Sequence, residues 1–449
     1  MKRSYSAPVI ERNTAGFINK FAYKSVVTHQ DNIEGILTDK LVGNYGSPLF
    51  VFVESTIRRR YRKLFETVKL QYPNVEMSWS YKTNYLGAIC NIYHQEGAKA
   101  EVVSGFEYEK AKKLGVLGKN IIFNGPAKRK ADIIIAVTDG AVIHIDHLDE
   151  LFVIEKVVAE LDTMCKVAIR VNMDTGIVPM WTRFGFNYEN GEAIRAIQRL
   201  LKNTRLKLVG LHTHIGTFIL DANAYYWAAQ KLLTLAQQVE DRFGIVVDYI
   251  DLGGGFASNN TLHQSLMPGE YGTPSFDQYA TAIGVAFNES EFALKHNPKL
   301  ILEAGRSLID ESGYLISTII GKKNLATGEK AVILDAGVNI NITAWWYKLK
   351  VIPTTPFPGT YQNMMFYGPL CMNIDLIRPA MPFPDTQTGD RVIIFPVGAY
   401  NVTQWMQFIE YRPNVVLITE SGAVEIIRHK EDLSDVINRE RIPEHLKAF

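Results

Sequence analysis

Residues 75–84 read V-E-M-S-W-S-Y-K-T-N, a run typical of a buried strand that nevertheless ends on a lysine. Two interpretations of Lys82 stand open. Its stem could be covered while its ammonium reaches solvent from the strand tip. Alternatively, the side chain is buried because its amine is needed for covalent chemistry. The rest of the chain must decide between them.

The run at 75–82 is one of nine short apolar runs that alternate with longer stretches of helical spacing. Alternating strands and helices predict a parallel sheet, and about eight repeats over roughly 250 residues predict a (β/α)8 TIM-type barrel. If the barrel begins at residue 75, eight strands remain, and the run at 49–53 either lies elsewhere or adds an outer strand. The runs are 49–53, 75–82, 99–103, 120–124, 141–145, 165–172, 206–214, 246–254 and 299–304.

After residue 308 the pattern changes to short strand-like runs joined by loops rich in Pro, Gly and Asn. This pattern predicts a mainly antiparallel β domain. A chain of 449 residues is long enough for two domains. We therefore predict a barrel at residues 47–308 and a β domain formed by residues 1–46 together with residues 309–449.

The composition limits the partners of the chain. A formal net charge of +1 argues against general attraction to nucleic acid or to an anionic membrane. Three cysteines indicate a reducing compartment and no disulfide framework. No apolar run has the length of a transmembrane helix, and the N-terminus lacks a secretory core. We expect a soluble cytoplasmic protein that binds neither nucleic acid nor membrane.

Polar residues gather at the C-terminal ends of the predicted barrel strands, which is where the active sites of this fold lie. One polar strand end is ordinary, because strands always meet polar loops. The whole set is poorly explained in that way. It comprises Lys82, Glu101, Asn124, His144, Arg170, His212, His214, Gly253 to Gly255 and Glu303 to Arg306.

Two of these strand ends favour a phosphate ligand. D-L-G-G-G-F supplies Gly253, Gly254 and Gly255, whose backbone N–H groups can surround an anion, although a lone triple glycine is more often a turn. E-A-G-R adds Gly305 and Arg306, and arginine suits phosphate. The two motifs end predicted strands seven and eight, where TIM barrels often hold a phosphate.

A reactive amine, a phosphate site and an acid together meet the requirements of pyridoxal 5'-phosphate. Lys82 would form a Schiff base with the aldehyde of this cofactor. Glu303 would keep the ring nitrogen protonated, so that the ring can accept electrons, and His214 could stack on the ring face. The sequence therefore predicts pyridoxal phosphate as the cofactor and no metal site.

At these motifs the sequence resembles the fold-type III pyridoxal-phosphate decarboxylases, which include the diaminopimelate and ornithine decarboxylases. S-Y-K-T-N resembles their lysine motif, and H-T-H-I-G-T their histidine motif, with His214 as the stacking residue and Thr217 near the phosphate. G-G-G-F and E-A-G-R resemble the phosphate and ring-nitrogen elements, with Ala304 in place of the usual proline. G-A-Y ends at Tyr400, which resembles the phosphate-contacting tyrosine. Y-G-P-L-C-M-N-I-D resembles the motif whose cysteine, here Cys371, acts from the partner subunit.

This resemblance spans nearly the whole chain and implies the alanine racemase/decarboxylase fold with a head-to-tail homodimer that shares its active sites. It implies removal of the α-carboxylate of an amino-acid-type small molecule as carbon dioxide, with Cys371 or Lys82 returning a proton to Cα. Cys371 alone would more often be a buried hydrophobe. Its position between Gly-Pro and Asp375 favours the functional role. Glu101 and Arg170 would order Lys82 and the hydroxyl of the cofactor.

Two charges with which diaminopimelate decarboxylases recognise their substrate are missing. Met372 replaces the glutamate after the cysteine, and Thr343 stands where an arginine grips a substrate carboxylate, although Tyr347 matches the later tyrosine. These replacements predict a larger, less charged pocket and make meso-diaminopimelate an unexpected substrate. Arg183, in W-T-R-F-G-F, resembles a basic element near the substrate and could equally be a surface residue. The predicted substrate contacts are Arg183, Thr343, Tyr347, Met372 and Asp375.

Several other residues have plainer interpretations. Trp345 and Trp346 are more typical of core or interface aromatics than of a substrate pocket. His144 and His212 are expected to be structural, and the basic residues at 127–131 to begin a solvated helix.

Four functions compete. A decarboxylase acting on an amino acid or an amino-acid-bearing intermediate fits best. The alternatives are an amino-acid racemase on the same barrel, a diaminopimelate decarboxylase proper, and a non-catalytic relative of the decarboxylases. Retention of Lys82, Glu303 and Cys371 argues against the last of these.

Overall fold

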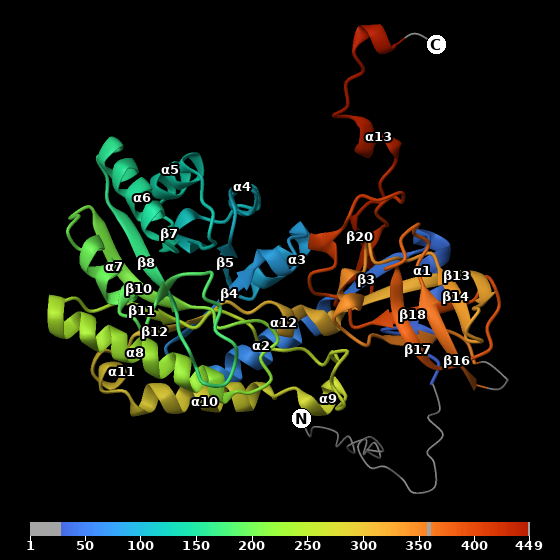
Figure 1. Cartoon of the computed structure of the whole chain (residues 1–449), viewed down its shortest axis with the longest axis horizontal. Coiled ribbons are helices and arrows are strands. Elements are labelled where there is room, and N and C mark those ends of the chain that lie inside the picture. Colours follow the sequence, from blue (N-terminus) through green and yellow to red (C-terminus); the bar gives the residue numbers. More distant parts are fainter. Residues whose placement is uncertain (1–27, 357–360, 448–449) are drawn as a thin grey trace, which may run out of the picture.

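The computed structural model describes residues 28–356 and 361–447 (Figure 1). It contains a closed barrel surrounded by helices and, beside it, a second region built on a large sheet. Both regions contribute to one extended apolar core, which runs from the barrel helices into the second sheet.

Eight parallel strands form the barrel. Strand β12 pairs with β4, and β8 pairs with β10, so that the sheet closes on itself. All eight runs predicted between residues 75 and 304 are strands of this barrel, which confirms the predicted fold. The strands are β4 (Val75–Ser80), β5 (Lys99–Val102), β6 (Ile121–Phe123), β7 (Val142–Ile145), β8 (Cys165–Asn172), β10 (Leu206–Thr213), β11 (Tyr249–Asp251) and β12 (Lys299–Leu302). A short extra strand, β9 (Phe186–Asn187), pairs with β8.

Helices cover the outside of the barrel (Figure 1). Each turns an apolar stripe toward the strands; on α8, for example, Leu232, Leu233 and Val239 are buried. The main helices are α2 (Glu54–Gln71), α3 (Gly87–Gln95), α4 (Gly105–Lys113), α5 (Lys130–Asp139), α6 (Leu148–Glu160), α7 (Glu192–Leu200), α8 (Asn223–Phe243), α10 (Phe276–Glu289) and α11 (Glu291–His296).

The second region is a nine-stranded sheet in which most neighbours are antiparallel, as predicted. Among the described strands of this second sheet, only β3 with β19 and β14 with β16 pair in parallel. The strands are β3 (Leu49–Val53), β13 (Gly313–Asn324), β14 (Lys330–Leu334), β15 (Lys350–Pro353), β16 (Tyr361–Tyr367), β17 (Leu376–Pro384), β18 (Arg391–Phe395), β19 (Val415–Ile418) and β20 (Val424–Arg428).

The apolar run at residues 49–53, which the barrel does not need, is β3, and it lies in this second sheet between β13 and β19. Its residues therefore pair outside the barrel, although the predicted barrel range began at residue 47. The run resembles a barrel strand because all five of its side chains are buried, with its two faces in different apolar clusters. Helix α1 (Thr38–Tyr45) packs Leu41 in the same cluster as Val51, while residues 1–27 of the predicted domain lie outside the described residues.

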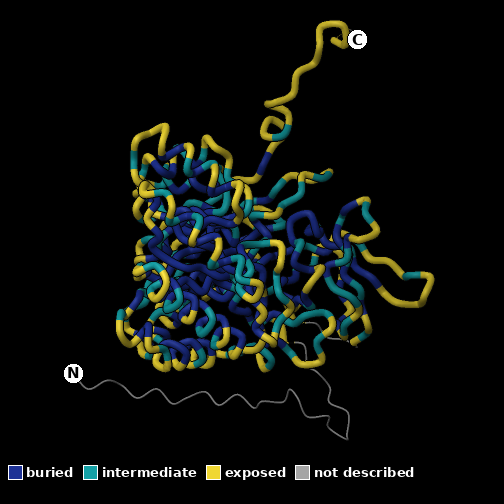
Figure 2. The backbone as a smooth tube through the Cα atoms, turned by 60° about the vertical axis from the view of Figure 1, so that its left-hand side comes forward, coloured by how far each residue is buried: buried dark blue, intermediate teal, exposed yellow. Residues whose placement is uncertain are grey.

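The C-terminal segment beyond Asp432 leaves the body of the protein and is almost entirely exposed (Figure 2). It contains one short helix, α13 (Leu433–Ile437). Among the described residues, no helix combines the length and apolar character needed to cross a membrane.

Candidate active site

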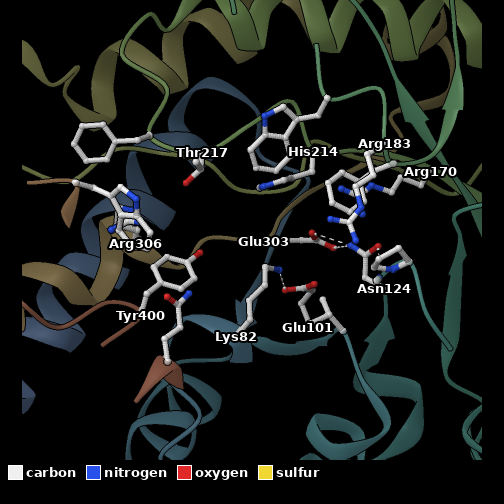
Figure 3. Close-up of a pocket in the computed structure, with 18 of the residues that line it drawn as sticks. Lys82, Glu101, Asn124, Arg170, Arg183, His214, Thr217, Glu303, Arg306 and Tyr400 are labelled. Carbon is white, nitrogen blue, oxygen red and sulfur yellow. Dashed lines mark hydrogen bonds and ion pairs between the residues drawn. The ribbon is translucent and has the colours of Figure 1, made fainter. Parts of the chain in front are cut away.

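A cavity of about 670 Å³ opens at the C-terminal ends of the barrel strands (Figure 3). Its inner wall consists of strand-end residues, and its outer wall includes side chains from the second region. The strand-end residues are Lys82, Glu101, Asn124, Arg170, His214 and Glu303; the second region supplies Trp346, Tyr347, Tyr400 and Gln404.

Lys82 lies in the short 3-10 turn Tyr81–Thr83 that follows β4 directly. Its Nζ donates to Glu101 Oε2 at 2.6 Å and lies 3.3 Å from Ser80 Oγ. Burial lowers the pKa of Lys82, but the charges of Glu101 and Glu303 more than offset this and leave the pKa raised. The amine therefore points into the cavity rather than to the outer surface.

Glu101 is completely buried at the end of β5 and is held by two donors. Ser80 Oγ donates to its Oε2 at 2.5 Å, and Lys82 donates to the same oxygen. Its Oε1 has no hydrogen-bond partner among the described residues. Burial raises the pKa of Glu101, and Lys82 opposes that shift. Glu101 thus fixes the position of the Lys82 amine and leaves one oxygen for a further donor.

Arg170 lies near the end of β8 and forms another part of the inner wall. Its Nη1 lies 3.4 Å from Asp146 Oδ1, and its guanidinium lies 4.6 Å from the centre of the Phe184 ring. Burial lowers the pKa of Arg170, with Asp146 acting in the opposite direction. The side chain is therefore clamped between an acid and an aromatic face.

Arg306 begins the short helix α12 (Arg306–Ile309) and is built to meet an anion. Its side chain is largely buried, and its Nε and Nη1 have no hydrogen-bond partner among the described residues. The closest carboxylate oxygen, Asp310 Oδ2, is 3.9 Å away. Buried arginine donors without a partner are costly, so this site fits a phosphate group.

The glycine motif leaves space beside Arg306, although its N–H groups are used differently from the prediction. Gly253 N donates to Asp251 Oδ1 at 2.8 Å, and Gly254 N donates to His214 Nδ1 at 3.0 Å. These two N–H groups hold the loop and are not free for an anion. A Cβ on Gly254 would lie 2.4 Å from Glu303 O, so any side chain there would displace the backbone of the neighbouring strand end.

Tyr400 reaches this end of the site from the second region. It has a left-handed backbone conformation with φ of 65°, which costs a non-glycine residue roughly 1 kcal/mol or more. Its N–H donates to Thr83 O at 2.9 Å, and its ring lies 4.6 Å from the Arg306 guanidinium. The strained backbone thus brings the phenol beside the candidate phosphate site, where Thr217 and Gly255 also line a small recess.

His214 presents a neutral ring to the cavity. Burial lowers the pKa of His214 well below its usual value, and the cations Lys82 and Arg170 act in the same direction. Trp181 packs against the imidazole with ring centres 5.6 Å apart. A fixed, uncharged ring at this position is suited to stacking on a flat ligand.

Glu303 stands at the end of β12 inside a shell of polar side chains. Asn124 Nδ2 lies 3.3 Å from each carboxylate oxygen, and His212 Nε2 lies 3.2 Å from Oε2. His144 and Asp251 complete the shell, and the four acids and histidines bring oxygen or nitrogen atoms within 4.8 Å of one another. The histidines expected to be structural therefore surround the acid that was predicted to face the ring nitrogen.

Four residues predicted to contact or react with the substrate do not line this cavity. Thr343 is buried against Asn341 and Asn401, and Asp375 is buried with its carboxylate accepting from Val338 N at 2.7 Å and Leu370 N at 2.8 Å. The two carboxylate oxygens of Asp375 thus hold its own loop, through Leu370, and the loop after β14, through Val338. Cys371, which is exposed, and Met372 lie on the connection between β16 and β17.

The aromatic wall at the cavity mouth was largely missed from the sequence. Trp181, Phe184 and Phe218 line it, together with Trp346, which the sequence suggested as a core or interface residue. Trp181 and Phe184 flank the predicted Arg183 in W-T-R-F-G-F, so this motif is the sequence feature that could have indicated them as cavity residues. Tyr347 and Arg183 line the cavity as predicted contacts.

The expectation of a solvated helix start at residues 127–131 is wrong for Lys128. Its side chain is completely buried, with Nζ 2.6 Å from Glu150 Oε1 and donating to the carbonyls of Gly125 and His144. Helix α5 begins only at Lys130, so Lys128 belongs to the preceding loop and ties it beneath β7.

Taken together, the geometry fits a ligand with a phosphate at one end, a flat ring in the middle and a group that reacts with an amine. Arg306 offers unpartnered buried donors to the phosphate, His214 offers a ring face, and Lys82 offers the amine. These are the demands of pyridoxal phosphate.

Comparison with known proteins agrees with this assignment. Residues 55–310 match the family described as "Pyridoxal-dependent decarboxylase, pyridoxal binding domain". The diaminopimelate decarboxylase of Methanocaldococcus jannaschii is 28% identical over 431 residues, which cover 92% of this chain and 95% of that protein. The L-glutamyl-(BtrI acyl-carrier protein) decarboxylase of Niallia circulans is 26% identical over 428 residues, covering 90% and 96% of the two chains.

Similarity extends to three dimensions. The crystal structure of the M. jannaschii diaminopimelate decarboxylase in complex with L-lysine matches with a TM-score of 0.84 and 27% identity, covering 94% of this chain and 99% of that one. The family match, the full-length relatives and the site geometry agree. The chain belongs to the fold-type III pyridoxal-phosphate-dependent decarboxylases, and it is a carboxy-lyase acting on an amino-acid-type substrate.

Proposed function

We propose that Lys82 bonds the aldehyde of pyridoxal phosphate, that Arg306 and Tyr400 bind its phosphate, and that Glu303 faces its ring nitrogen. The unpartnered Nε and Nη1 of Arg306 support the second role, and the exposed side of the Lys82 amine supports the first. When bound, the cofactor accepts the electron pair that the departing carboxylate leaves behind.

The protein's own groups then have defined tasks. Glu101 accepts a hydrogen bond of 2.6 Å from the Lys82 amine and keeps that amine within reach of the reacting carbon. When it is not bonded to the cofactor, the Lys82 ammonium, held by Glu101, would be placed to supply a proton to Cα of the substrate. Arg170 and the unpartnered Oε1 of Glu101 lie on the side where the hydroxyl of the cofactor would be held. Thr217, Gly255 and Gly305 leave room for the phosphate.

We further propose that the substrate has an uncharged or conjugated distal end and is not meso-diaminopimelate. Among the described residues that line the cavity, the only acids are Glu101 and Glu303. Glu101 is paired with Lys82 and has its second oxygen assigned above to the hydroxyl of the cofactor, and Glu303 lies against Asn124 and His212. A distal ammonium would thus meet no free carboxylate from this chain. The mouth offers Trp181, Phe184 and Trp346 instead, with Arg183 as its one cation.

Two observations bear on the choice of substrate class. Met372 and Thr343 replace the charged residues of the diaminopimelate decarboxylases, which supports a different substrate. The relative that acts on a glutamyl group carried by an acyl-carrier protein supports a conjugated amino acid. Against this, several relatives of similar identity are diaminopimelate decarboxylases, so that activity is the second candidate.

We also propose that the active form is a head-to-tail homodimer in which Cys371 of one protomer completes the cavity of the other. The exposure of Cys371 and its absence from the cavity wall of its own chain support this arrangement. In the dimer, the thiol and Lys82 would be the two candidates for returning the proton to Cα.

The test is product mass spectrometry with the cofactor-loaded enzyme. The panel contains meso-diaminopimelate, both enantiomers of lysine, ornithine, arginine and glutamate, and the amides and thioesters of the diacids. Loss of carbon dioxide chiefly from members without a free distal ammonium supports the proposal. Efficient turnover of meso-diaminopimelate would contradict it and establish the second candidate.

A further inference from the structure

Asp251 is a completely buried carboxyl that the proposed chemistry does not use. It ends β11, and its Oδ1 accepts the N–H of Gly253 at 2.8 Å. No donor among the described residues reaches its Oδ2. Asp251 has an oxygen within 4.8 Å of a Glu303 oxygen, so that two carboxyl groups share one buried site. An arrangement of this kind needs a proton to be stable.

The donors around the two groups show where the negative charge lies. Glu303 receives His212 Nε2 at 3.2 Å and Asn124 Nδ2 at 3.3 Å, whereas Asp251 receives only the Gly253 N–H. More donors favour the charged form of a carboxyl group. Burial raises the pKa of Asp251 well above its usual value, and the charge of Glu303 adds to that shift. The burial of Asp251 and its smaller number of donors therefore favour the proton on this residue.

The remaining members of the shell are neutral. Burial lowers the pKa of both His144 and His212 well below the usual value, and it raises that of Tyr249. The Tyr249 hydroxyl lies 2.8 Å from His144 Nε2, and His144 Nδ1 lies 4.0 Å from Glu303 Oε1. One carboxylate thus sits among neutral donors.

Charged groups outside this shell also act on it. Lys82 and Glu101 at the β4 and β5 ends and Arg170 on β8 line the cavity, whereas Lys128 lies buried beneath β7.

We propose that Asp251 is a positioning residue that keeps its proton and donates it as a hydrogen bond to Glu303. This hydrogen bond holds the Glu303 carboxylate charged and oriented toward the cavity, where it can face the protonated ring nitrogen of the cofactor. The inference deepens the proposed function and rests on the role proposed there for Glu303.

A metal ion is the competing interpretation of the same four residues, because His144, His212, Asp251 and Glu303 are all possible ligands. The two interpretations differ in the state of Asp251. A metal ligand must be an ionised carboxylate. A neutral hydrogen-bond donor can be replaced by asparagine, whose amide keeps the shape, accepts from Gly253 N and donates toward Glu303.

The first test is infrared spectroscopy of the full-length holoenzyme at mildly alkaline pH. The wild type is expected to show the carbonyl stretch of a protonated carboxyl that disappears in Asp251→Asn. Asp335→Asn is the matched control. Burial also raises the pKa of Asp335, but this residue lies in the second sheet against Ser47 and Ser317. A wild-type spectrum without a band assignable to Asp251 would overturn the proposal.

The second test compares the binding of pyridoxal phosphate with that of its analogue in which carbon replaces the ring nitrogen. Both ligands use Lys82 and the phosphate site equally, so the ratio of their dissociation constants isolates the contact of Glu303 with the nitrogen. Asp251→Asn should keep the wild-type ratio within a few-fold. Asp251→Ala should lower the preference for pyridoxal phosphate about tenfold or more, because a hydrogen bond to a charged group is lost.

The outcomes separate this inference from the role of Glu303. If Glu303→Gln abolishes the preference but Asp251→Ala does not, Glu303 contacts the nitrogen without help from Asp251, and the inference fails. If Glu303→Gln leaves the preference unchanged, the proposed role of Glu303 itself fails. An Asp251→Asn protein as impaired as Asp251→Ala, or zinc binding that is lost in Asp251→Asn, would show an ionised Asp251 and overturn the inference.

Discussion

Lys82 Nζ lies 2.6 Å from Glu101 Oε2, and this ion pair stands at the centre of the cavity between two neighbouring strand ends (Figure 3). Glu101 is completely buried, whereas about a third of the Lys82 side chain, 32%, is exposed to the cavity. The acid is thus fixed by the fold, and the amine remains able to move toward a ligand. This pairing sets the charge of the amine before the cofactor binds.

Glu101→Gln is expected to lower the pKa of the Lys82 amine, because Glu101 is the main charge that raises it. At a given pH, a pKa that is lower by one makes the unprotonated fraction of the amine about tenfold larger. The rate at which the apoprotein forms its Schiff base with pyridoxal phosphate, measured against pH, should move to lower pH. Turnover should fall, since a neutral amide holds the amine less firmly than a carboxylate does. If the rate of Schiff-base formation has the same pH dependence in Glu101→Gln as in the wild type, Glu101 does not control the pKa of Lys82.

Arg306→Gln is expected to weaken the affinity for pyridoxal phosphate by about tenfold to a hundredfold, the value of a charge-assisted hydrogen bond. Spectroscopic titration of the apoprotein measures this change. The matched control is Arg129→Gln, since Arg129 lies on the surface and its side chain is 79% exposed. Equal affinities of the two variants would remove Arg306 from the phosphate site.

Gly305→Ala is expected to disrupt the phosphate end of the site, because the new Cβ would lie 2.2 Å from Thr83 Oγ1. Thr83 is itself completely buried, so the hydroxyl cannot swing away freely. Removing it in the double variant Gly305→Ala/Thr83→Ala should restore part of the lost cofactor affinity. Strictly additive effects of the two substitutions would argue that the clash is relieved by other movements.

Mixing two inactive variants tests the shared active site. Lys82→Ala and Cys371→Ala should each show little turnover alone. After unfolding and refolding together, half of the dimers pair one variant with the other, and one of their two sites carries both residues. The mixture should recover about a quarter of the wild-type activity. No recovery, or a fully active Cys371→Ala, would place the proton donor elsewhere.

The stability of the protein should fall as pH rises, in part because of Glu107. Burial raises the pKa of Glu107 from 4.5 to about 7 in the folded protein. A raised acid pKa adds stability below the unfolded value, and this stability is lost as the pH passes through the folded value. Glu107→Gln keeps an acceptor for Val103 N but cannot ionise. It should remove about 3 kcal/mol of this pH dependence, measured by urea denaturation. If the free energy of unfolding of Glu107→Gln depends on pH as steeply as that of the wild type, Glu107 is not the group responsible for this pH dependence.

The barrel was predictable because its evidence is repeated along the chain. Each strand has a short apolar run in the sequence, and parallel strands buried on both faces need little else to be recognised. The same property left the place of residues 49–53 open, because β3 is buried on both faces of a different sheet. The spacing of apolar residues and the burial it predicts do not show which sheet a strand joins.

The inner site was predictable to a similar extent, since Lys82, Glu101, Arg170, His214 and Glu303 all end strands and their side chains share one cavity. The outer wall was not. Trp346 and Phe218 reach the cavity from loops whose path depends on tertiary contacts. Asp375 shows the converse failure, because a carboxylate in a functional motif is engaged by backbone N–H groups of its own loop and of the loop after β14.

The most direct test of the account compares lysine with Nε-acetyllysine as substrates of the holoenzyme. The two share the reacting end and differ at the distal group, which is a charged ammonium in lysine and a larger, neutral acetamide in Nε-acetyllysine. The account predicts a higher kcat/KM for carbon dioxide release from Nε-acetyllysine, because the mouth is aromatic and lacks a free carboxylate among the described residues that line it. A clear preference for lysine would contradict it and would point to an acid, supplied to the cavity in the assembled enzyme, that recognises a distal ammonium.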